Sequence, residues 1–270
     1  MASTLNWAMA FRIFRKTVIF CVAAIGWASV VGAGEKVILY GDENYAPYSY
    51  VESGKFRGMY VEILEKAAER LKPAYDVMLQ PVPWKRGLAD LEFGSAFALF
   101  PPGLKRERTY IDRYSVPIFH ETVVVFCNDA VMSRHPVRFP EDFNGLTVGV
   151  NLGFLLSDRL MQAAKQGTVK IESAKNNEAN LKKLASRRVD CFASDRAAAR
   201  HSAQQLELYF ASNGFKLQEA VELSGEDTFI GYSVKNQPSY KTDFIAKMDA
   251  ALDAMKRNGQ IAKIVSEYLR

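Results

Sequence analysis

The strongest constraint on the fold is a regular alternation of short apolar runs with segments of helical periodicity. An apolar run at 36–42 is followed by a segment at 60–71 whose apolar residues recur at the spacing of one helix face. Further apolar runs at 75–82 and 96–100 enclose a second, shorter helical segment. A strand–helix–strand–helix–strand series of this kind is typical of a mostly parallel sheet covered by helices.

The same architecture restarts in the second half of the chain, although the sequence itself does not repeat. Because two such series are present, we expect two lobes, with a cleft where the carboxyl ends of their strands face each other. We interpret 224–227 as a turn-rich break between two late strands, and two amphipathic helices end the chain. The strand candidates are 120–127, 146–151, 168–174, 189–194, 215–223 and 229–234, and the helical candidates are 155–165 and 178–187.

The first 33 residues predict a cleavable signal peptide. Three basic residues at 12–16 precede any acidic residue, and 17–31 is an apolar stretch too short to favour a membrane span. The sequence Val31-Gly32-Ala33 offers the small or apolar residues that a signal peptidase reads, so we expect cleavage after Ala33 and export. An uncleaved anchor is the alternative, because the basic region is long.

Removal of that segment also removes most of the excess positive charge. The whole chain has 35 Lys and Arg against 30 Asp and Glu, and three of the cations precede residue 34, which leaves 35 − 3 = 32 against 30. Since no dense basic face with interleaved aromatic residues is present, we expect no nucleic-acid partner. The three histidines are scattered and there is no CxxC motif, so we expect no metal and no cofactor.

Two cysteines, Cys127 and Cys191, would remain after cleavage. In an oxidising compartment they could form a disulfide. They could equally be two buried thiols in neighbouring strands, because spacing carries no information on geometry. The sequence leaves this choice open.

A basic loop at 105–117 is the strongest candidate for ligand contact. It follows the apolar run at 96–100, which a Pro-Pro-Gly sequence ends, and it carries four cations within nine residues. In an open α/β sheet, the loop after a strand's carboxyl end is where an arginine can hold an anion. The alternative is that this loop is a solvated surface turn with no role in binding. We expect Arg108 to bind ligand, and Lys105 and Arg106 to be solvated.

Four short motifs then occur in order along the chain. Together, at this spacing, they resemble the type II periplasmic solute-binding proteins that serve polar amino acid uptake, the bacterial extracellular solute-binding proteins of family 3. The motifs are Tyr45-Ala46-Pro47-Tyr48 ahead of a helix led by Gly58, Glu107-Arg108 with Tyr114-Ser115-Val116-Pro117, Val148-Gly149-Val150-Asn151-Leu152-Gly153, and Val189-Asp190-Cys191-Phe192-Ala193-Ser194-Asp195.

The resemblance implies an α/β fold of the periplasmic binding protein-like II class. It has two βαβ-type lobes, a ligand cleft and a two-strand hinge. We expect the first lobe to comprise 34–120 and 226–270, and the second lobe to comprise 121–225.

The resemblance also implies roles for individual residues. Arg108 corresponds to the arginine that grips a ligand carboxylate, since a guanidinium fork can hold both oxygens. Asp195 corresponds to the aspartate that receives the ligand's ammonium group, although it could simply cap a helix. Tyr45 falls on the ring that packs against the ligand, and Trp84 lies near another pocket aromatic. The other ligand-binding candidates are Tyr48, Arg86, Gly103 and Phe154.

Two departures from the family pattern bear on the ligand. After Gly153 the family usually has hydroxyl residues, which bind a carboxylate at a helix N-terminus. Phe154 and Leu155 occupy those places here, and Phe97 replaces a frequent acidic residue. The first departure removes one arm of the amino-acid clamp and favours an aromatic or otherwise unusual ligand.

The function implied by the resemblance is non-catalytic. We expect a monomeric periplasmic protein that closes on a small zwitterionic or anionic, amino-acid-like solute and delivers it to an ABC transporter permease. In the first alternative, a membrane sensor reads the closure. In the second, the protein is an enzyme similar to cyclohexadienyl dehydratases, which would need a general acid such as Asp42 or Glu43. The absence of a nucleophile elbow or phosphate loop argues against catalysis.

Overall fold

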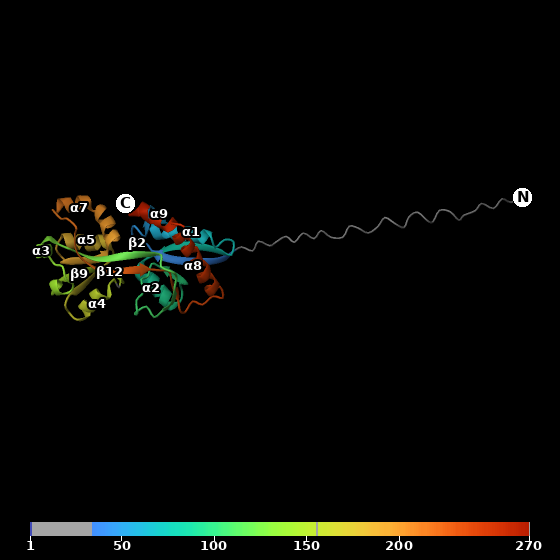
Figure 1. Ribbon diagram of the computed structural model, residues 1–270, viewed down its shortest axis with the longest axis horizontal. Helices are drawn as coiled ribbons and strands as arrows, with labels where there is room; N and C mark the ends of the chain where they lie inside the picture. Colours follow the sequence, from blue (N-terminus) through green and yellow to red (C-terminus); the bar gives the residue numbers. More distant parts are fainter. Residues whose placement is uncertain (2–33, 155, 270) are drawn as a thin grey trace. The chain divides into compact units, whose positions relative to one another are not determined.

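The computed structural model describes Met1, residues 34–154 and residues 156–269. Apart from Met1, the predicted signal peptide at 1–33 lies outside the described residues. The first sheet has the order β5-β1-β6-β13-β7, in which β1 pairs in parallel with β5 and β6. Its strands are β1 (Glu35–Asp42), β5 (Tyr75–Val82), β6 (Ala98–Phe100), β7 (Ile111–Tyr114) and β13 (Gly231–Ser233), and its helices are α1 (Met59–Glu69), α2 (Trp84–Phe93), α8 (Lys241–Arg257) and α9 (Gln260–Tyr268). Helices α1, α8 and α9 are grouped together beside this sheet (Figure 1).

The second sheet has the order β10-β9-β11-β8-β12, with β9 parallel to β10 and β11, and with β8 antiparallel to β11 and β12. Both sheets are therefore mixed, and the expected α/β class is confirmed. The strands are β8 (Phe119–Cys127), β9 (Thr147–Asn151), β10 (Lys170–Ala174), β11 (Cys191–Asp195) and β12 (Gln218–Thr228), and the helices are α3 (Asp129–Met132), η1 (Glu141–Phe143), α4 (Asp158–Lys165), α5 (Asn177–Ala185), α6 (Arg196–Gln204) and α7 (Glu207–Ser212).

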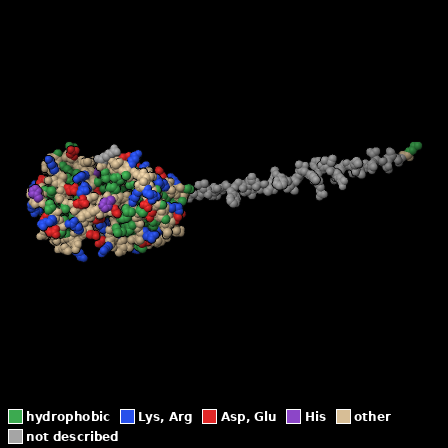
Figure 2. All heavy atoms as spheres, in the orientation of Figure 1, with side chains coloured by type: hydrophobic (Ala, Val, Ile, Leu, Met, Phe, Trp, Pro, Cys, Tyr) green, Lys and Arg blue, Asp and Glu red, His purple; other side chains and the backbone are tan. Residues whose placement is uncertain are grey.

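Charged side chains of both signs cover the surface. On the face shown in Figure 2, lysine and arginine are interspersed with aspartate and glutamate. Many are paired, as in the Arg196–Glu219 contact of 2.8 Å. No single-sign patch is visible on this face, in agreement with the near balance of charges after residue 33.

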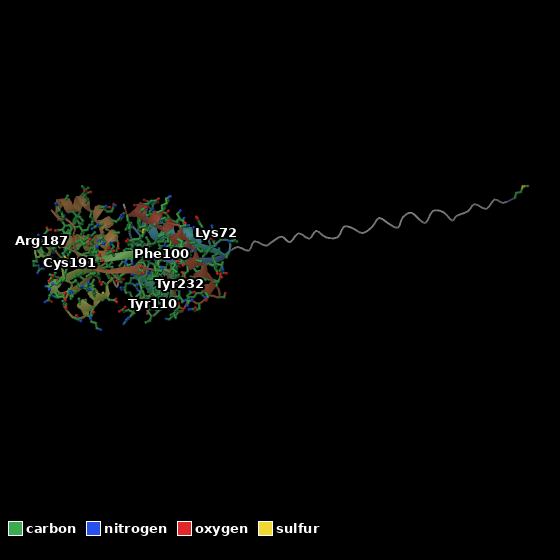
Figure 3. The ribbon with its side chains drawn as sticks, viewed as in Figure 1. Lys72, Phe100, Tyr110, Arg187, Cys191 and Tyr232 are labelled. Atoms are coloured by element: carbon green, nitrogen blue, oxygen red, sulfur yellow. A yellow bond between two sulfur atoms is a disulfide. The ribbon has the colours of Figure 1, made fainter. Side chains whose placement is uncertain are left out.

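The central strands of each sheet, such as β6, β8 and β11, are buried on both faces, which explains why they appear in the sequence as continuous apolar runs. In β8, Val125 packs with the α4 side of the sheet, while Val124 packs with α5, α6 and α7 on the other side. In the first sheet, α1, α8 and α9 cover the face that includes Phe100 and Tyr232, and α2 covers the opposite face (Figure 3).

The chain crosses between the two sheets twice. It leaves the first sheet after β7 to enter β8, and it returns from β12 to β13. We predicted a break at 224–227, and this was wrong: β12 continues through these residues. β8 pairs with β12 along its whole length, so the backbone N–H and C=O groups at 224–227 find partners in the ladder. Two register irregularities accommodate the difference in length between the two strands.

Two segments expected as loops contain strands. The aromatic loop forms a small sheet of three strands, β2 (Asn44–Tyr45), β3 (Ser49–Glu52) and β4 (Lys55–Arg57). The basic loop contains β7, an edge strand that pairs with β13. Both are short pairings that only tertiary contacts make possible.

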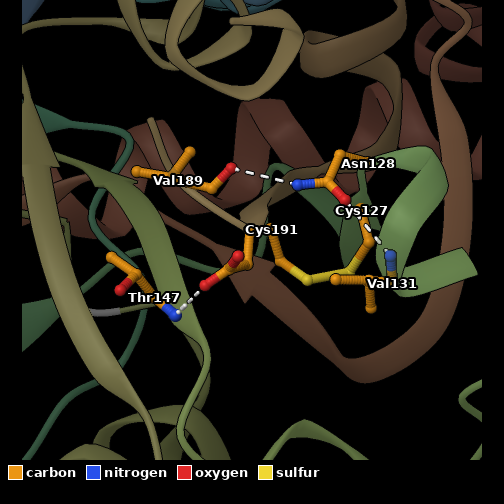
Figure 4. The surroundings of a disulfide bond; sticks show 7 residues. Cys127, Asn128, Val131, Thr147, Val189 and Cys191 are labelled. Carbon is orange, nitrogen blue, oxygen red and sulfur yellow. Dashed lines mark hydrogen bonds between the residues drawn. A yellow bond between two sulfur atoms is a disulfide. The ribbon is translucent and has the colours of Figure 1, made fainter. Parts of the chain in front are cut away.

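Cys127 and Cys191 form a disulfide with an S–S distance of 1.99 Å (Figure 4). The two residues are directly opposite each other in the antiparallel pair of β8 and β11. Nearby, the Asn128 side chain caps α3 by accepting from the Val131 N–H, and the Asp190 carboxylate accepts from the Thr147 N–H at 2.8 Å. The question left open by the sequence is thus answered in favour of the bond.

We predict that loss of this disulfide lowers the free energy of unfolding by about 4 kcal/mol, the chain-entropy value for a bond of its sequence separation of 64. Urea titration of the Cys127→Ala/Cys191→Ala double variant should show this loss. Wild-type protein titrated with a reductant should behave like the variant. Equal midpoints with and without reductant would contradict the prediction.

Candidate functional site

A cavity of about 50 Å³ lies between residues of the two sheets and their loops. Charged side chains and aromatic rings line it together, which is the composition expected of a small-molecule site. Five of the predicted ligand-binding residues line this cavity: Tyr45, Trp84, Gly103, Arg108 and Phe154. Three do not: Tyr48, Arg86 and Asp195.

Arg108 is held in place by its own loop. Arg108 is only 5% exposed, and one of its guanidinium nitrogens donates to the Gly103 carbonyl at 2.7 Å. The guanidinium carbon lies 5.6 Å from the centre of the Trp84 ring. In the described part of the chain, no carboxylate lies within 4.0 Å of it. Burial lowers the pKa of this guanidinium, although the nearby tyrosines Tyr110 and Tyr114 oppose the shift.

Aromatic rings from both lobes close the cavity. Phe154 meets Tyr45 edge-on at 5.3 Å and Trp84 edge-on at 5.7 Å between ring centres. The indole nitrogen of Trp84 also donates to the Gly153 carbonyl at 3.3 Å. Phe154 therefore fills apolar space where we expected ligand, and it joins the turn after β9 to the start of α2.

The loop that carries Tyr48 is fixed against the start of α1. Gly58 has a φ of 125°, and a Cβ at this residue would lie 2.4 Å from the Tyr48 carbonyl oxygen. Only glycine permits this approach. The Tyr60 N–H then donates to the same carbonyl at 2.8 Å. This arrangement brings the Tyr48 side chain across to the second lobe.

Asp195 is occupied by contacts within the protein. One carboxylate oxygen accepts from the Tyr48 hydroxyl at 2.7 Å and from the Ala198 N–H at 2.8 Å. The other accepts from the Thr122 N–H at 3.2 Å. Asp195 is thus the N-cap of α6, and burial raises the pKa of its carboxyl group. It lines a different cavity, of about 410 Å³, together with Tyr48.

Two basic residues differ from their expected surroundings. Arg86 does not line the cavity of Arg108, since its side chain is 75% exposed and lies 3.6 Å from Asp90 on the same helix. Lys105 was expected to be solvated, and this was wrong. Its side chain is 6% exposed, because its ammonium group donates to the Leu156 carbonyl at 2.5 Å and pairs with Glu226 at 2.8 Å.

Among the cavity residues that sequence reasoning missed are its two acidic residues, Glu121 and Glu226, which are opposite each other in the β8–β12 pair. Glu121 is 7% exposed. Its carboxylate accepts from the hydroxyl of Tyr45 at 2.5 Å and from the hydroxyl of Tyr60. Burial raises the pKa of Glu121 well above its usual value. One feature of the sequence could have indicated Glu121: it is an acidic residue at the start of a β-branched run, at the expected border between the lobes.

Asp42 is a further buried carboxyl group at the carboxyl end of β1. It accepts from the Asn44 N–H at 2.9 Å. Burial raises the pKa of Asp42 from 3.8 to about 7. It is not among the residues that line the Arg108 cavity.

We predict that Asp42 makes the protein less stable as the pH rises from about 4 to 7. In this window the folded state keeps a proton that the unfolded state has lost, so the free energy of unfolding falls by about 1.4 kcal/mol per pH unit from this group. In urea titrations at several pH values, the free energy of unfolding of Asp42→Asn should therefore increase relative to that of the wild type as the pH rises. Asp76→Asn, at an exposed residue of β5, is the control. A constant difference between Asp42→Asn and wild type would contradict the assignment.

This geometry defines the class: a two-lobed α/β ligand-binding protein of the type II periplasmic kind. The profile of the bacterial extracellular solute-binding proteins, family 3, matches residues 37–270, and the chain belongs to this family. Among the described residues, none of the helices is long and apolar enough to cross a membrane. A search of curated protein sequences finds no match.

Solved structures of the same fold are numerous, and three illustrate their range. The ancestral amino acid-binding protein AncCDT-1, a precursor of cyclohexadienyl dehydratase, is 19% identical with a TM-score of 0.67, covering 87% of this chain and 95% of its own. A histidine kinase sensor domain is 16% identical with a TM-score of 0.72, covering 87% and 96%. The arginine-, lysine-, histidine-binding protein ArtJ from Geobacillus stearothermophilus is 22% identical with a TM-score of 0.68, covering 87% and 95%.

Proposed function

We propose that this protein binds a small zwitterionic or anionic, amino-acid-like solute in the periplasm and delivers it to the permease of an ABC transporter. The observation that carries the proposal is the buried guanidinium of Arg108. It lines the cavity between the lobes, and no carboxylate of the described residues lies within 4.0 Å of it. A ligand carboxylate would supply the missing partner through two charge-assisted hydrogen bonds.

The family and its solved members support this class of solute. The amino-acid-binding relatives include ArtJ and the ancestral protein AncCDT-1. Export through a signal peptide at 1–33 agrees with the extracellular setting named for the family. A monomer suffices for this function, because both sides of the cavity come from one chain.

Delivery requires the lobes to open and close. A cavity of about 50 Å³ has room for only a few water molecules, so a solute must enter before the site closes. We propose that the lobes are 34–120 with 226–270, and 121–225. The hinge would then lie where β8 and β12 leave the first sheet, as in other proteins that close around a ligand.

We predict that Arg108→Ala lowers affinity for the solute on the order of 100-fold, because two hydrogen bonds between charged groups are lost. A thermal-shift screen of amino acids, polyamines and small organic acids would first identify the solute, since binding to the folded state raises the melting temperature. Calorimetry on the variant would then measure the loss.

Arg106→Ala is the matched control for this experiment. It removes the same charge two residues away, from an exposed side chain. Unchanged affinity in Arg108→Ala, or an equal loss in both variants, would rule out a specific contact with Arg108.

A sensing role is the second candidate, favoured by the similarity in fold to a histidine kinase sensor domain. The same closure would then be read by a membrane receptor. Stimulation of a permease ATPase by the loaded protein would favour transport. Ligand-dependent binding to a sensor kinase, without such stimulation, would favour sensing.

We expect no dehydratase activity. Asp42 and Glu43, the candidates for a general acid from the sequence, are not among the residues lining the cavity of Arg108. Glu121 does line it, but we assign that carboxyl group to binding. Incubation with arogenate or prephenate, followed by chromatography, should therefore release no aromatic product. Product formation that Arg108→Ala abolishes would instead place the protein among the enzymes of this fold.

A further inference from the structure

Four charged side chains line the small cavity, and only two of them are paired with each other. Lys105 and Glu226 form an ion pair at 2.8 Å. The other two are Arg108 and Glu121. Within the described residues, no Lys or Arg nitrogen lies within 4.0 Å of the Glu121 carboxylate, and no carboxylate lies within 4.0 Å of Arg108. One cavity therefore holds a buried cation and a buried acid, each without a partner of opposite charge.

Burial disfavours the charged forms of both groups, and a ligand that places a charge of opposite sign beside each would favour their ionisation. A carboxylate would meet Arg108 and an ammonium group would meet Glu121. A molecule that carries both groups is a zwitterion. The charges of the cavity thus select this class over a simple acid or a simple amine.

Asp195 is poorly placed for the ammonium group. It lines the larger cavity and not the one that contains Arg108, whereas Glu121 lines the same cavity as Arg108. Both carboxylates accept hydrogen bonds from the protein. Those of Asp195 include two backbone N–H groups, of Ala198 and Thr122, while those of Glu121 come, among the described residues, only from the side-chain hydroxyls of Tyr45 and Tyr60.

We propose that Glu121, and not Asp195, receives the ammonium group of the ligand, and that the solute is a compact zwitterion held between Glu121 and Arg108. The inference rests on the proposed function and specifies its substrate class. The solute is compact because Phe154, Tyr45 and Trp84 already fill the apolar side of the cavity with their mutual contacts.

The surroundings of Glu121 suit this role. The hydroxyls of Tyr45 and Tyr60 orient the carboxylate, and Thr228 donates to the Tyr60 hydroxyl at 2.9 Å. The neighbouring acids, Glu226 and Asp195, add negative potential and raise the pKa of Glu121 further. An incoming ammonium group is attracted by the same potential.

The test measures how strongly the protein prefers an amine. Calorimetry would compare the best amino acid from the thermal-shift screen with the carboxylic acid that lacks its amino group. In wild type, the amino acid should bind on the order of 100-fold more tightly. In Glu121→Gln this ratio should fall at least 10-fold, while the affinity for the acid stays within about 3-fold of wild type.

Two further variants make the result specific. Glu107→Gln removes an exposed carboxylate from the neighbouring loop and should keep the wild-type ratio. Glu121→Asp draws the carboxylate back by one methylene group and should weaken binding of the amino acid more than that of the acid, which provides a test if Glu121→Gln does not fold. An equal effect of Glu121→Asp on both ligands would overturn the proposal.

The outcomes separate this inference from the proposed function. If wild type binds an amino acid and Asp195→Asn loses the preference for the amine while Glu121→Gln keeps it, the inference is wrong and the proposed function stands. If wild type binds only acids without an amino group, the zwitterion assignment fails while the role of Arg108 remains. If wild type binds no compound of the screen, both are wrong.

Discussion

The antiparallel ladder between β8 and β12 holds the two lobes together, because the chain leaves the first sheet just before β8 and returns to it just after β12. Its hydrogen bonds run from Phe119 to Cys127 without interruption by a loop, so the crossing is an extended two-strand ribbon. The same ribbon carries Glu121 and Glu226 into the cavity. The proposed hinge and the candidate site are therefore built from the same backbone.

Most of the sheet architecture could be predicted from local pattern. The runs at 36–42, 75–82 and 120–127 are strands. The clearest of them, 120–127, lies in a strand buried on both faces, where apolar residues are needed at most positions. The turn that we predicted at 224–227 could not be excluded from local pattern alone. Its residues favour turns locally, and only the presence of a long partner strand, which the sequence does not reveal, keeps them extended.

The position of Arg108 at the cavity could be predicted from the sequence, although its role in binding stays a proposal. Arg108 follows a buried strand, and its burial without a carboxylate partner agrees with the chemistry expected of it. Lys105 shows the opposite case. A long, flexible side chain can reach either water or a distant carbonyl, and the deciding partner, Leu156, is far along the chain. Glu121 was overlooked for the same reason, since its tyrosine partners are remote in sequence.

Hydrogen bonds join the two sides of the cleft directly. Tyr48 with Asp195, Trp84 with Gly153, and Lys105 with Leu156 each join groups on opposite sides of the cleft. Such hydrogen bonds contribute about 1 kcal/mol each. They stabilise the arrangement in which the two sides of the cleft meet, and a solute could shift the protein toward or away from it only by its differential affinity.

The disulfide has a mechanical consequence. It joins β8 to β11 within the second sheet, at the end of β8 away from Glu121, so it stiffens one lobe and leaves the crossing free to bend. Six residues of extended chain separate Cys127 from Glu121, a distance of about 20 Å. If the lobes move about the proposed hinge near Glu121, the Cys127 end of the ladder moves further than the Glu121 end, and a distance probe near Cys127 would register that motion.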